Sequence, residues 1–328
     1  MEIKIALDGM GGDNAPFSPA KAAIMSEELP GVKVFLVGKE NILKNYIKKE
    51  SENITIIHSE KEVGMEEKVS LSILKEKDNS MYKTLSLLKD EQVDCALSAG
   101  NTAIFVTLAI SLIGLIKDVE RPAIAVLLPS VSGNFSIFLD VGANINPKPS
   151  HLLQYGIMGS LYAKRVFEIE KPRVALLNIG KEASKGDELR KEAYRLLQNQ
   201  KDINFIGNIE GQELFLDKAD VIVTDGFTGN SILKVSEGLT RSVKSILRRE
   251  LTKNFLGKLG TLLLSKNFRE FSKKADYAEY GGGILLGLNK PIIISHGRSS
   301  PRAIFNAIKL GKRIIEKGFI QFLKKEFE

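Results

Sequence analysis

The chain has 328 residues, 43% of them hydrophobic and 27% charged, which is ordinary for a soluble protein and long enough for one large α/β domain or two smaller ones. Its single cysteine, Cys95, excludes an intramolecular disulfide and a cysteine metal cluster within one chain, and the absence of a signal-peptide pattern predicts a cytoplasmic location. The net charge of +7 comes from residues 241–274, where ten Lys or Arg stand against two Glu, so a local patch for an anionic partner is favoured and a broad nucleic-acid surface is not.

The first predicted element is an apolar strand, residues 2–7, that leads into the glycine-rich sequence ALDGMGGDNAP at residues 6–16. Dinucleotide-binding domains begin in this way, but their fingerprint needs a third glycine where this chain has Asn14. The carboxylate of Asp13 would also repel a pyrophosphate. The sequence therefore predicts a strand, a loop and a helix with Pro16 in its first turn, and it disfavours a nucleotide site.

Strands and helices alternate along the rest of the chain. Strands are predicted at residues 2–7, 32–37, 54–58, 93–97, 123–128, 134–143, 173–179, 220–224 and 291–295. Helices are predicted at about residues 17–29, 40–50, 69–90, 101–116, 150–168, 187–199, 228–250 and 300–317. This alternation predicts βαβ units and a mainly parallel sheet with helices on both faces.

Two segments refine this α/β interpretation. A Ser-Gly-Asn turn joins residues 123–128 to 134–143 and predicts one antiparallel pair. The longest apolar run, residues 103–116, is too short to span a membrane and predicts a buried helix. Because no repeat or linker divides the chain, residues 1–328 are interpreted as a single domain.

Several predicted strands end in a small or polar residue that leads into a turn or a helix start. Open α/β sheets bind ligands at the carboxyl ends of their strands, where glycines admit ligands to the backbone and helix N-termini favour anions. A composite polar pocket is therefore predicted at the strand ends marked by Asp8, Ser98, Asp140, Asn178, Asp225 and Ser295.

The same loops carry a resemblance to a known family. In chain order they read GMGGDNAP, LSAGNT, RPAIAVLLPS, DVGANINPKPSHLLQYGIMG, LLNIGKEASKGDEL, FIGNIEG, VIVTDGFTGN, YGG and IIISHG. This series resembles the PlsX-type phosphate acyltransferases over about residues 3–310. The chain departs from the usual pattern at Gly9, Asp187 and GGGILLG, and Lys181 and Arg298 add cations that could change how strongly the pocket holds anions.

The resemblance implies a Rossmann-like α/β/α sandwich related to phosphotransacetylases and isopropylmalate dehydrogenases, usually as a homodimer. It implies reversible transfer of a long fatty acyl chain from acyl carrier protein to inorganic phosphate, without a cofactor. The acyl phosphate would then feed glycerol-3-phosphate acylation in bacterial phospholipid synthesis, with the downstream membrane acyltransferase as a further partner.

The residues agree with this chemistry, because a phosphate dianion attacking a thioester needs no protein nucleophile. The departing thiol has a pKa of about 8.5, so the enzyme has mainly to position phosphate and stabilise an oxyanion. Lys185 in SKGDEL is the predicted phosphate cation, and the Asn230 amide is the predicted donor to the thioester oxygen. His296 in SHG is the third predicted catalytic residue, through phosphate or through a neighbour.

The remaining predicted substrate or phosphate contacts come from the same loops. They are Asp8, Gly11, Gly12, Asn14, Ser98, Asn101, Thr102, Asn144, Ser295 and Gly297. The three histidines show no metal-ligand spacing, with His58 expected at the surface and His151 at a helix start. Aspartates at strand ends could bind Mg²⁺, but they also cap loops and hold cations, so no metal site is predicted.

The basic segment carries an apolar stripe, in which Val243, Leu247, Leu251, Phe255 and Leu259 recur every four residues. Two helices meeting near Gly257 and Gly260 would form an amphipathic hairpin at residues 238–277. Apolar insertion with basic flanks is how interfacial helices bind anionic lipids, which predicts a peripheral association with the membrane. The predicted membrane contacts are Leu256, Lys258, Leu259, Leu262 and Leu263.

Other interpretations stay open at this point. A short-chain phosphotransacetylase acting on acyl-coenzyme A would need nearly the same pocket, and a non-catalytic lipid-binding or nucleic-acid-binding module could be built on the basic segment. The apolar stripe could instead pack on the core or on a dimer partner. The basic face could also receive the acidic acyl carrier protein.

Overall fold

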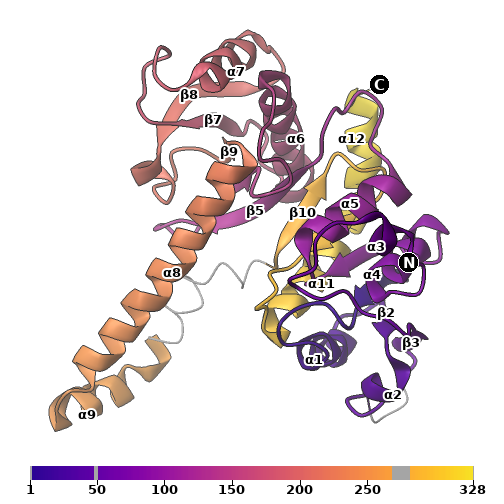
Figure 1. Cartoon of the computed structure of the whole chain (residues 1–328). Coiled ribbons are helices and arrows are strands. Elements are labelled where there is room, and N and C mark those ends of the chain that lie inside the picture. Colours follow the sequence, from indigo (N-terminus) through magenta and orange to yellow (C-terminus); the bar gives the residue numbers. More distant parts are fainter. Residues whose placement is uncertain (1, 48–50, 268–280, 328) are drawn as a thin grey trace.

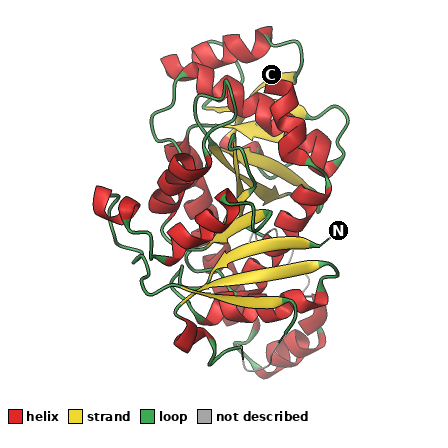
Figure 2. Ribbon diagram, turned by 90° about the vertical axis from the view of Figure 1, so that its right-hand side faces the viewer, coloured by secondary structure: helices red, strands yellow, loops and turns green. Residues whose placement is uncertain are grey.

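Runs of aliphatic, largely β-branched residues form the strands of one twisted sheet (Figure 2). The computed structural model describes residues 2–47, 51–267 and 281–327. Within these ranges the sheet has eleven strands in the order β3-β2-β1-β4-β11-β10-β5-β6-β9-β7-β8. Their bounds are β1 Ile3–Asp8, β2 Val32–Gly38, β3 Ile54–His58, β4 Cys95–Ser98, β5 Ala123–Pro129, β6 Phe135–Leu139, β7 Arg173–Asn178, β8 Asn204–Glu210, β9 Val221–Val223, β10 Gly283–Leu286 and β11 Ile292–Ile294.

The sheet consists of two parallel groups joined by antiparallel strands. Strands β3, β2, β1, β4 and β11 pair in parallel, and so do β6, β9, β7 and β8. Between the groups, β10 pairs antiparallel with β11 and β5, and β5 pairs antiparallel with β6. The predictions of a mainly parallel sheet and of one antiparallel pair at β5 and β6 are confirmed.

Helices cover both faces of this sheet. Their bounds are α1 Phe17–Met25, η1 Ser26–Glu28, α2 Glu40–Leu43, α3 Leu71–Lys75, α4 Ser80–Lys89, α5 Thr102–Ile113, α6 Pro149–Phe167, α7 Glu188–Asn199, η2 Gly211–Glu213, α8 Gly226–Leu251, α9 Phe255–Leu263, α11 Pro301–Glu316 and α12 Phe319–Phe327. Because side chains alternate along a strand, Ile5 and Leu7 of β1 belong to a core cluster that also contains residues of α1, α6, α7, α11 and α12, whereas Ala6 belongs to a second cluster with residues of α4 and α5. This is the predicted α/β/α sandwich.

Local chemistry explains where the sequence prediction of helices failed. The helix predicted at residues 69–90 is two helices, α3 and α4, because Asn79 ends one segment and starts the next. Its Oδ1 accepts from the Tyr82 N–H at 2.7 Å as the cap of α4, and its Nδ2 donates to the Glu76 carbonyl at 2.7 Å. Strands β8 and β10 and helix α12 were not predicted.

Two helices occupy the described part of the segment in which a hairpin was predicted, and the break between them comes before the predicted glycines. Helix α8 has 26 residues and is about 39 Å long, and α9 follows it after a break at Thr252–Asn254. The Asn254 side chain caps α9 by accepting from the Gly257 N–H at 2.7 Å. Gly257 and Gly260 therefore lie inside α9 and not at the turn, because the capping asparagine decides where the new helix begins.

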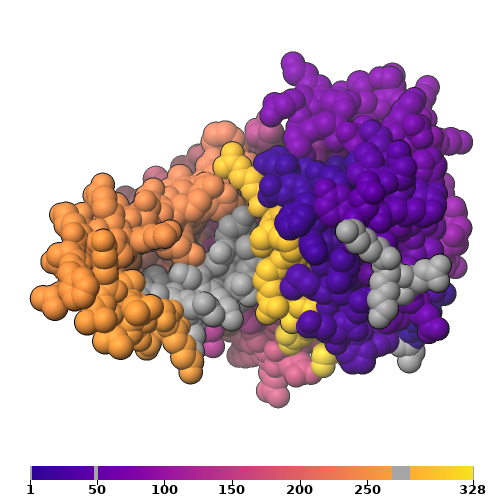
Figure 3. Space-filling model, turned by 90° about the horizontal axis from the view of Figure 1, so that it is seen from below, coloured from indigo at the N-terminus to yellow at the C-terminus, as the bar shows by residue number. Residues whose placement is uncertain are grey.

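The α8 and α9 pair projects from the rest of the molecule (Figures 1 and 3). On α9 the side chains of Leu256, Leu259, Leu262 and Leu263 are all exposed, and so is Lys258. Of the predicted hairpin, residues 268–277 lie outside the described residues. No helix in the described ranges is long and apolar enough to cross a membrane.

Candidate functional site

The loops after β1, β4 and β11 meet at one edge of the sheet, and residues 8–16, 98–102 and 295–298 are here called the first loop cluster. Asp8 is fully buried, and its carboxylate accepts from the Ser98 hydroxyl at 2.7 Å and from the Met10 N–H at 3.1 Å. Burial raises the pKa of this carboxyl, against the hydrogen bonds that it receives. Asp8 and Ser98 therefore join two loops whose residues are 90 positions apart.

Glycines let these loops approach one another closely. A Cβ atom at Gly11 would lie 2.4 Å from Asp8 Oδ2 and 2.8 Å from the Gly100 nitrogen, so no larger residue fits there. Gly12 has a φ of +106°, which other residues rarely adopt. The Asp13 N–H then donates to the Gly297 carbonyl at 2.8 Å, which fixes the first loop against the loop after β11.

The other predicted residues of this cluster divide into structural and exposed groups. The Ser295 N–H donates to the Ser98 carbonyl at 2.9 Å, and Ser295 is buried. Asn101 caps α5 by accepting from the Ile104 N–H, and its amide donates to the carbonyls of Met65 and Glu67. Thr102 is the first residue of α5, and Asn14 is exposed on the first loop.

The loops after β6, β7 and β9 form a second loop cluster, residues 140–148, 178–187 and 225–230. Asp140 is buried and accepts from four backbone N–H groups, those of Ile124, Gly142, Ala143 and Asn144, at 2.7–3.1 Å. Burial raises the pKa of its carboxyl, and these donors oppose that shift. The carboxylate thus shapes the loop that follows β6.

Asn144 is held inside this loop. Its side-chain amide donates to the Pro122 carbonyl at 2.5 Å and to the Tyr155 hydroxyl at 2.8 Å. Its backbone carbonyl accepts from the Gly226 N–H at 2.9 Å, at the start of α8. The two N–H groups of the Asn144 side chain are therefore occupied by the protein itself.

The start of α8 is fixed by an arginine. Asp225 caps the helix by accepting from the Thr228 N–H at 2.8 Å, and Arg190 of α7 donates to Asp225 at 2.5 Å and to the Thr228 hydroxyl at 3.1 Å. Burial favours a neutral Asp225, but Thr228 and the Arg190 guanidinium outweigh it and lower the pKa of this carboxyl. Arg190 also pairs with Asp187, so it joins α7, α8 and the loop between β7 and α7.

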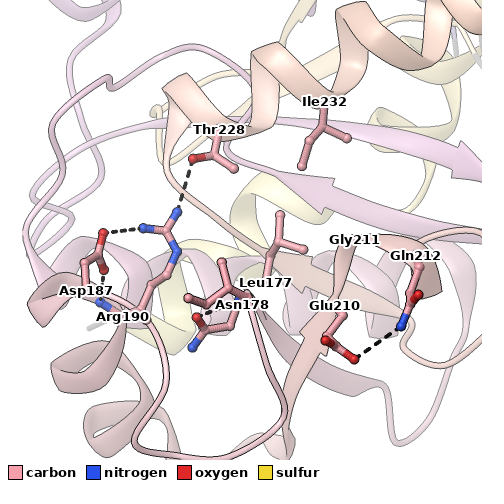
Figure 4. Close-up of a pocket in the computed structure, with 11 residues that line it drawn as sticks. Leu177, Asn178, Asp187, Arg190, Glu210, Gly211, Gln212, Thr228 and Ile232 are labelled. Atoms are coloured by element: carbon pink, nitrogen blue, oxygen red, sulfur yellow. Dashed lines mark hydrogen bonds and ion pairs between the residues drawn. The ribbon is translucent and has the colours of Figure 1, made fainter.

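A pocket of about 740 Å³ opens beside this arginine (Figure 4). Its lining combines apolar side chains with two amides, one hydroxyl, two carboxylates and one guanidinium. Its lining residues are Leu177, Asn178, Ile179, Gly186, Asp187, Arg190, Glu210, Gly211, Gln212, Thr228 and Ile232.

Lys185 stands at the edge of this pocket, next to the lining residue Gly186. Its side chain is exposed and its stem lies over Gly180, where a Cβ atom would be 2.9 Å from Lys185 Cγ. Its backbone carbonyl accepts from the Asn178 side chain at 3.0 Å. No ion pair or side-chain hydrogen bond involves the Lys185 amine within residues 2–47, 51–267 and 281–327.

Asn230 and His296 lie along one face of α8. Asn230 is exposed, and its Cβ and Cγ atoms are 3.8 Å from the Cβ position of Gly142 in the second loop cluster. His296 belongs to the first loop cluster, and its Nε2 lies next to the amine of Lys234, one helical turn after Asn230. Burial, followed by the nearby Lys234 charge, lowers the pKa of His296. Helix α8 thus connects the two loop clusters.

The other histidines have structural contacts. His151 Nδ1 accepts from the Lys148 N–H at 3.0 Å at the start of α6, and its Nε2 lies 3.0 Å from Glu120. His58 lies 3.2 Å from Glu60 and is exposed. In the described part of the chain, no group of three or more His, Cys, Asp or Glu side chains could hold a metal ion.

Comparison with known proteins decides the family. A family model described as "Fatty acid synthesis protein" matches residues 3–322. A phosphate acyltransferase of Thermodesulfovibrio yellowstonii is 44% identical over 96% of this chain and 91% of its own length, and one of Thermoanaerobacterium thermosaccharolyticum is 42% identical over 99% and 97%. The chain belongs to the PlsX family of phosphate acyltransferases. It is therefore an acyltransferase of fatty acid and phospholipid synthesis, as the resemblance in its loops predicted.

Solved structures agree with the fold of this phosphate acyltransferase. A phosphotransacetylase from Streptococcus pyogenes has a TM-score of 0.64 at 17% identity, covering 96% of this chain and 94% of its own. A branched-chain phosphotransacylase from Enterococcus faecalis has a TM-score of 0.61 at 13% identity, covering 95% and 98%. At such identities the likeness concerns the fold, and it confirms the predicted relation to phosphotransacetylases.

The sequence did not single out three polar side chains that lie at or beside the two loop clusters: Arg190, Lys234 and Glu237. A signal for the last two was present, because Asn230, Lys234 and Glu237 are spaced i, i+4 and i+7 and must share a helix face. Arg190 gave no comparable signal, since its partner Asp225 is 35 residues away.

The only cysteine of this phosphate acyltransferase offers no nucleophile. Cys95 is fully buried, its Sγ lies 3.2 Å from the Cβ position of Gly311, and burial raises the pKa of its thiol far above the usual range. Replacing Cys95 by alanine is therefore expected to leave kcat and KM for the acyl donor essentially unchanged. A folded variant that has lost turnover would contradict a reaction without an acyl-cysteine.

Proposed function

We propose that this phosphate acyltransferase moves a long acyl chain from acyl carrier protein to inorganic phosphate, reversibly and without nucleotide or metal. The observation that supports the proposal is the set of anion-binding groups around α8, together with the lack of an accessible thiol. Two glycine-rich loop clusters place backbone amides, an uncommitted lysine and an amide side chain around α8, and the only thiol is buried. This set can position an anion and stabilise an oxyanion, which is what a direct attack by phosphate requires.

In the proposed reaction, a phosphate oxygen forms a bond to the thioester carbonyl carbon and the carbonyl oxygen becomes an oxyanion. The carbon–sulfur bond then breaks, and the thiolate leaves with the carrier protein. Lys185 pairs with phosphate, the Asn230 amide donates to the oxyanion, and His296 contacts phosphate. Support comes from the exposure of Lys185 and from the place of Asn230 against the Gly142 backbone.

The predicted substrate-binding residues take two roles in this proposal. Those that lie open on the loops offer backbone or side-chain donors to substrate, and those that are buried or internally bonded hold the loops in shape. The first group is Gly12, Asn14, Thr102 and Gly297, and the second is Asp8, Gly11, Ser98, Asn101, Asn144 and Ser295.

Purified protein, long-chain acyl carrier protein and phosphate test this function directly. Free carrier protein should appear only when phosphate is present, in EDTA and without added nucleotide. Acetyl-coenzyme A in place of the acyl carrier protein should be a poor substrate. Loss of activity in EDTA, a strict need for ATP or NAD, or a preference for acetyl-coenzyme A would contradict the proposal.

We further propose that residues 1–328 act as one domain, in which residues 238–277 form a hairpin that binds the membrane surface. The protein would then be cytoplasmic and peripherally associated with anionic lipids, close to the downstream membrane acyltransferase. The exposed leucines and lysine of α9 support this proposal. An apolar row on α8 is also exposed and fits a homodimer; it comprises Val235, Leu239, Val243 and Ile246.

Replacing Leu259 and Leu263 together by glutamate is expected to abolish co-sedimentation with anionic vesicles and to spare turnover in solution. The change removes two exposed apolar side chains, at 46% and 76% exposure, and places negative charge near anionic headgroups. Binding by the unchanged protein should weaken with salt, since each basic residue near the surface contributes about 1 kcal/mol.

A matched control changes two apolar side chains of equal exposure elsewhere. Leu216 and Val131 are 46% and 77% exposed, and their joint replacement by glutamate should leave vesicle binding intact. Unchanged binding after the Leu259→Glu and Leu263→Glu changes would assign the leucines of α9 to another role.

A further inference from the structure

Three polar side chains converge where one face of α8 passes the first loop cluster. The Lys234 amine lies next to His296 Nε2, and Glu237 Oε2 lies 3.7 Å from that amine and 3.8 Å from Nε2. The Glu237 side chain is only 8% exposed, and its Oε1 has no hydrogen-bond partner among the residues that the structure describes. The cluster therefore contains an amine and an imidazole in hydrogen-bond contact with each other, and a buried carboxylate that lies at ion-pair distance from both.

The proton on His296 can be placed from its other nitrogen. Nδ1 accepts from the backbone N–H of Arg298 at 3.0 Å, so Nδ1 carries no proton. A neutral imidazole has one N–H, which is then on Nε2, and it faces the Lys234 amine, which only donates. Glu237 Oε2 lies beyond hydrogen-bond distance of the Lys234 amine and of His296 Nε2. The Lys234 amine and Nε2 are in hydrogen-bond contact, but with the proton on Nε2 both groups are donors, and an anionic acceptor bound beside them would satisfy both.

The position of these donors fits the reaction. Asn230, the proposed donor to the oxyanion, precedes Lys234 by four residues, so their Cβ atoms are about 5–6 Å apart on one helix face. Asn230 lies against the second loop cluster, and His296 belongs to the first. An anion bound by Lys234 and His296 would therefore lie one helical turn from the thioester oxygen.

We propose that Lys234 and the Nε2–H group of His296 bind oxygens of the phosphate nucleophile, and that Glu237 is a positioning residue for the Lys234 amine. This assignment rests on the proposed acyl transfer to phosphate and adds a second cation to Lys185. The same two donors could also bind the phosphodiester that joins a pantetheine arm to its carrier protein, because that group also presents anionic phosphate oxygens. The experiment distinguishes the two sources.

Steady-state kinetics of Lys234→Gln provides the first arm. Loss of a charge-assisted contact predicts that KM for phosphate rises about 10- to 100-fold, while KM for long-chain acyl carrier protein stays unchanged. Lys234→Arg should retain most of the phosphate affinity, which separates charge from shape. The control is Lys191→Gln on α7, because Lys191 is 42% exposed against 48% for Lys234 and also pairs with a glutamate three residues away.

Titration calorimetry with inorganic phosphate provides the second arm, and circular dichroism checks that each variant is folded. The wild type and Lys191→Gln should bind phosphate, and Lys234→Gln should bind it at least about tenfold more weakly. If phosphate binds in this Lys234-dependent way but no acyl transfer occurs, the inference holds and the proposed function fails. An unchanged phosphate KM and affinity in Lys234→Gln, a rise only in KM for acyl carrier protein, or no phosphate binding by the wild type would overturn the inference.

Discussion

Replacing Lys185 by alanine is expected to lower kcat/KM by about 10- to 100-fold, as expected for the loss of a transition-state charge contact. The stability of the fold should hardly change, within about 0.5 kcal/mol, because surface substitutions away from structural features usually do no more. The Lys185 side chain is exposed and makes no ion pair in the described ranges. Steady-state kinetics and urea unfolding of the same preparation measure both quantities.

The control for this variant is Lys191→Ala, which removes a lysine that pairs with Glu188 on the adjacent α7. It should retain the wild-type rate. A rate of Lys185→Ala equal to that of the control would remove Lys185 from the phosphate site and make it a solvated lysine of the loop.

Replacing Asp140 by alanine is expected to lower the free energy of unfolding by at least about 3 kcal/mol and to reduce turnover with it. The change leaves four backbone N–H groups, one of them buried and three partly buried, without their acceptor. It also releases the Gly142–Asn144 loop, which receives the start of α8 through the Gly226 N–H and lies against Asn230. Denaturant unfolding followed by circular dichroism gives the first quantity.

Two variants bracket the Asp140 result. Asp140→Asn keeps one carbonyl acceptor and should fall between the wild type and the alanine variant. Asp202→Ala removes an exposed carboxylate in the turn before β8 and should change the unfolding free energy by no more than about 0.5 kcal/mol. A loss below about 1 kcal/mol in Asp140→Ala would show that the loop keeps its shape without this carboxylate.

Much of the fold could be predicted because apolar periodicity reports burial. The alternation of strands and helices, the parallel groups and the β5–β6 pair all follow from local patterns. Strand β8 was missed because its sequence NFIGNIE contains glycine and asparagine and is only partly buried. The break between α3 and α4 depends on two hydrogen bonds of Asn79, and no periodicity reports them.

For the candidate site, the sequence predicted which loops matter but not what each residue does. Asp8 and Ser98 both end strands, as predicted, yet their contact with one another depends on the parallel neighbours β1 and β4. The Asn144 side chain is occupied by Tyr155 and Pro122, which only the packed structure reveals. Lys234 and Glu237 were readable from their helical spacing after Asn230, whereas the contact of Lys234 with His296 joins residues 62 positions apart.

The most direct test of acyl transfer to phosphate is to identify the product formed from ¹⁸O-labelled phosphate. Wild-type protein is incubated with long-chain acyl carrier protein and fully labelled phosphate in EDTA, and the lipid product is analysed by mass spectrometry. Direct attack by a phosphate oxygen predicts an acyl phosphate that retains the whole label, including the oxygen bonded to the carbonyl carbon. Release of unlabelled free fatty acid, with no labelled acyl phosphate at early times, would contradict the account.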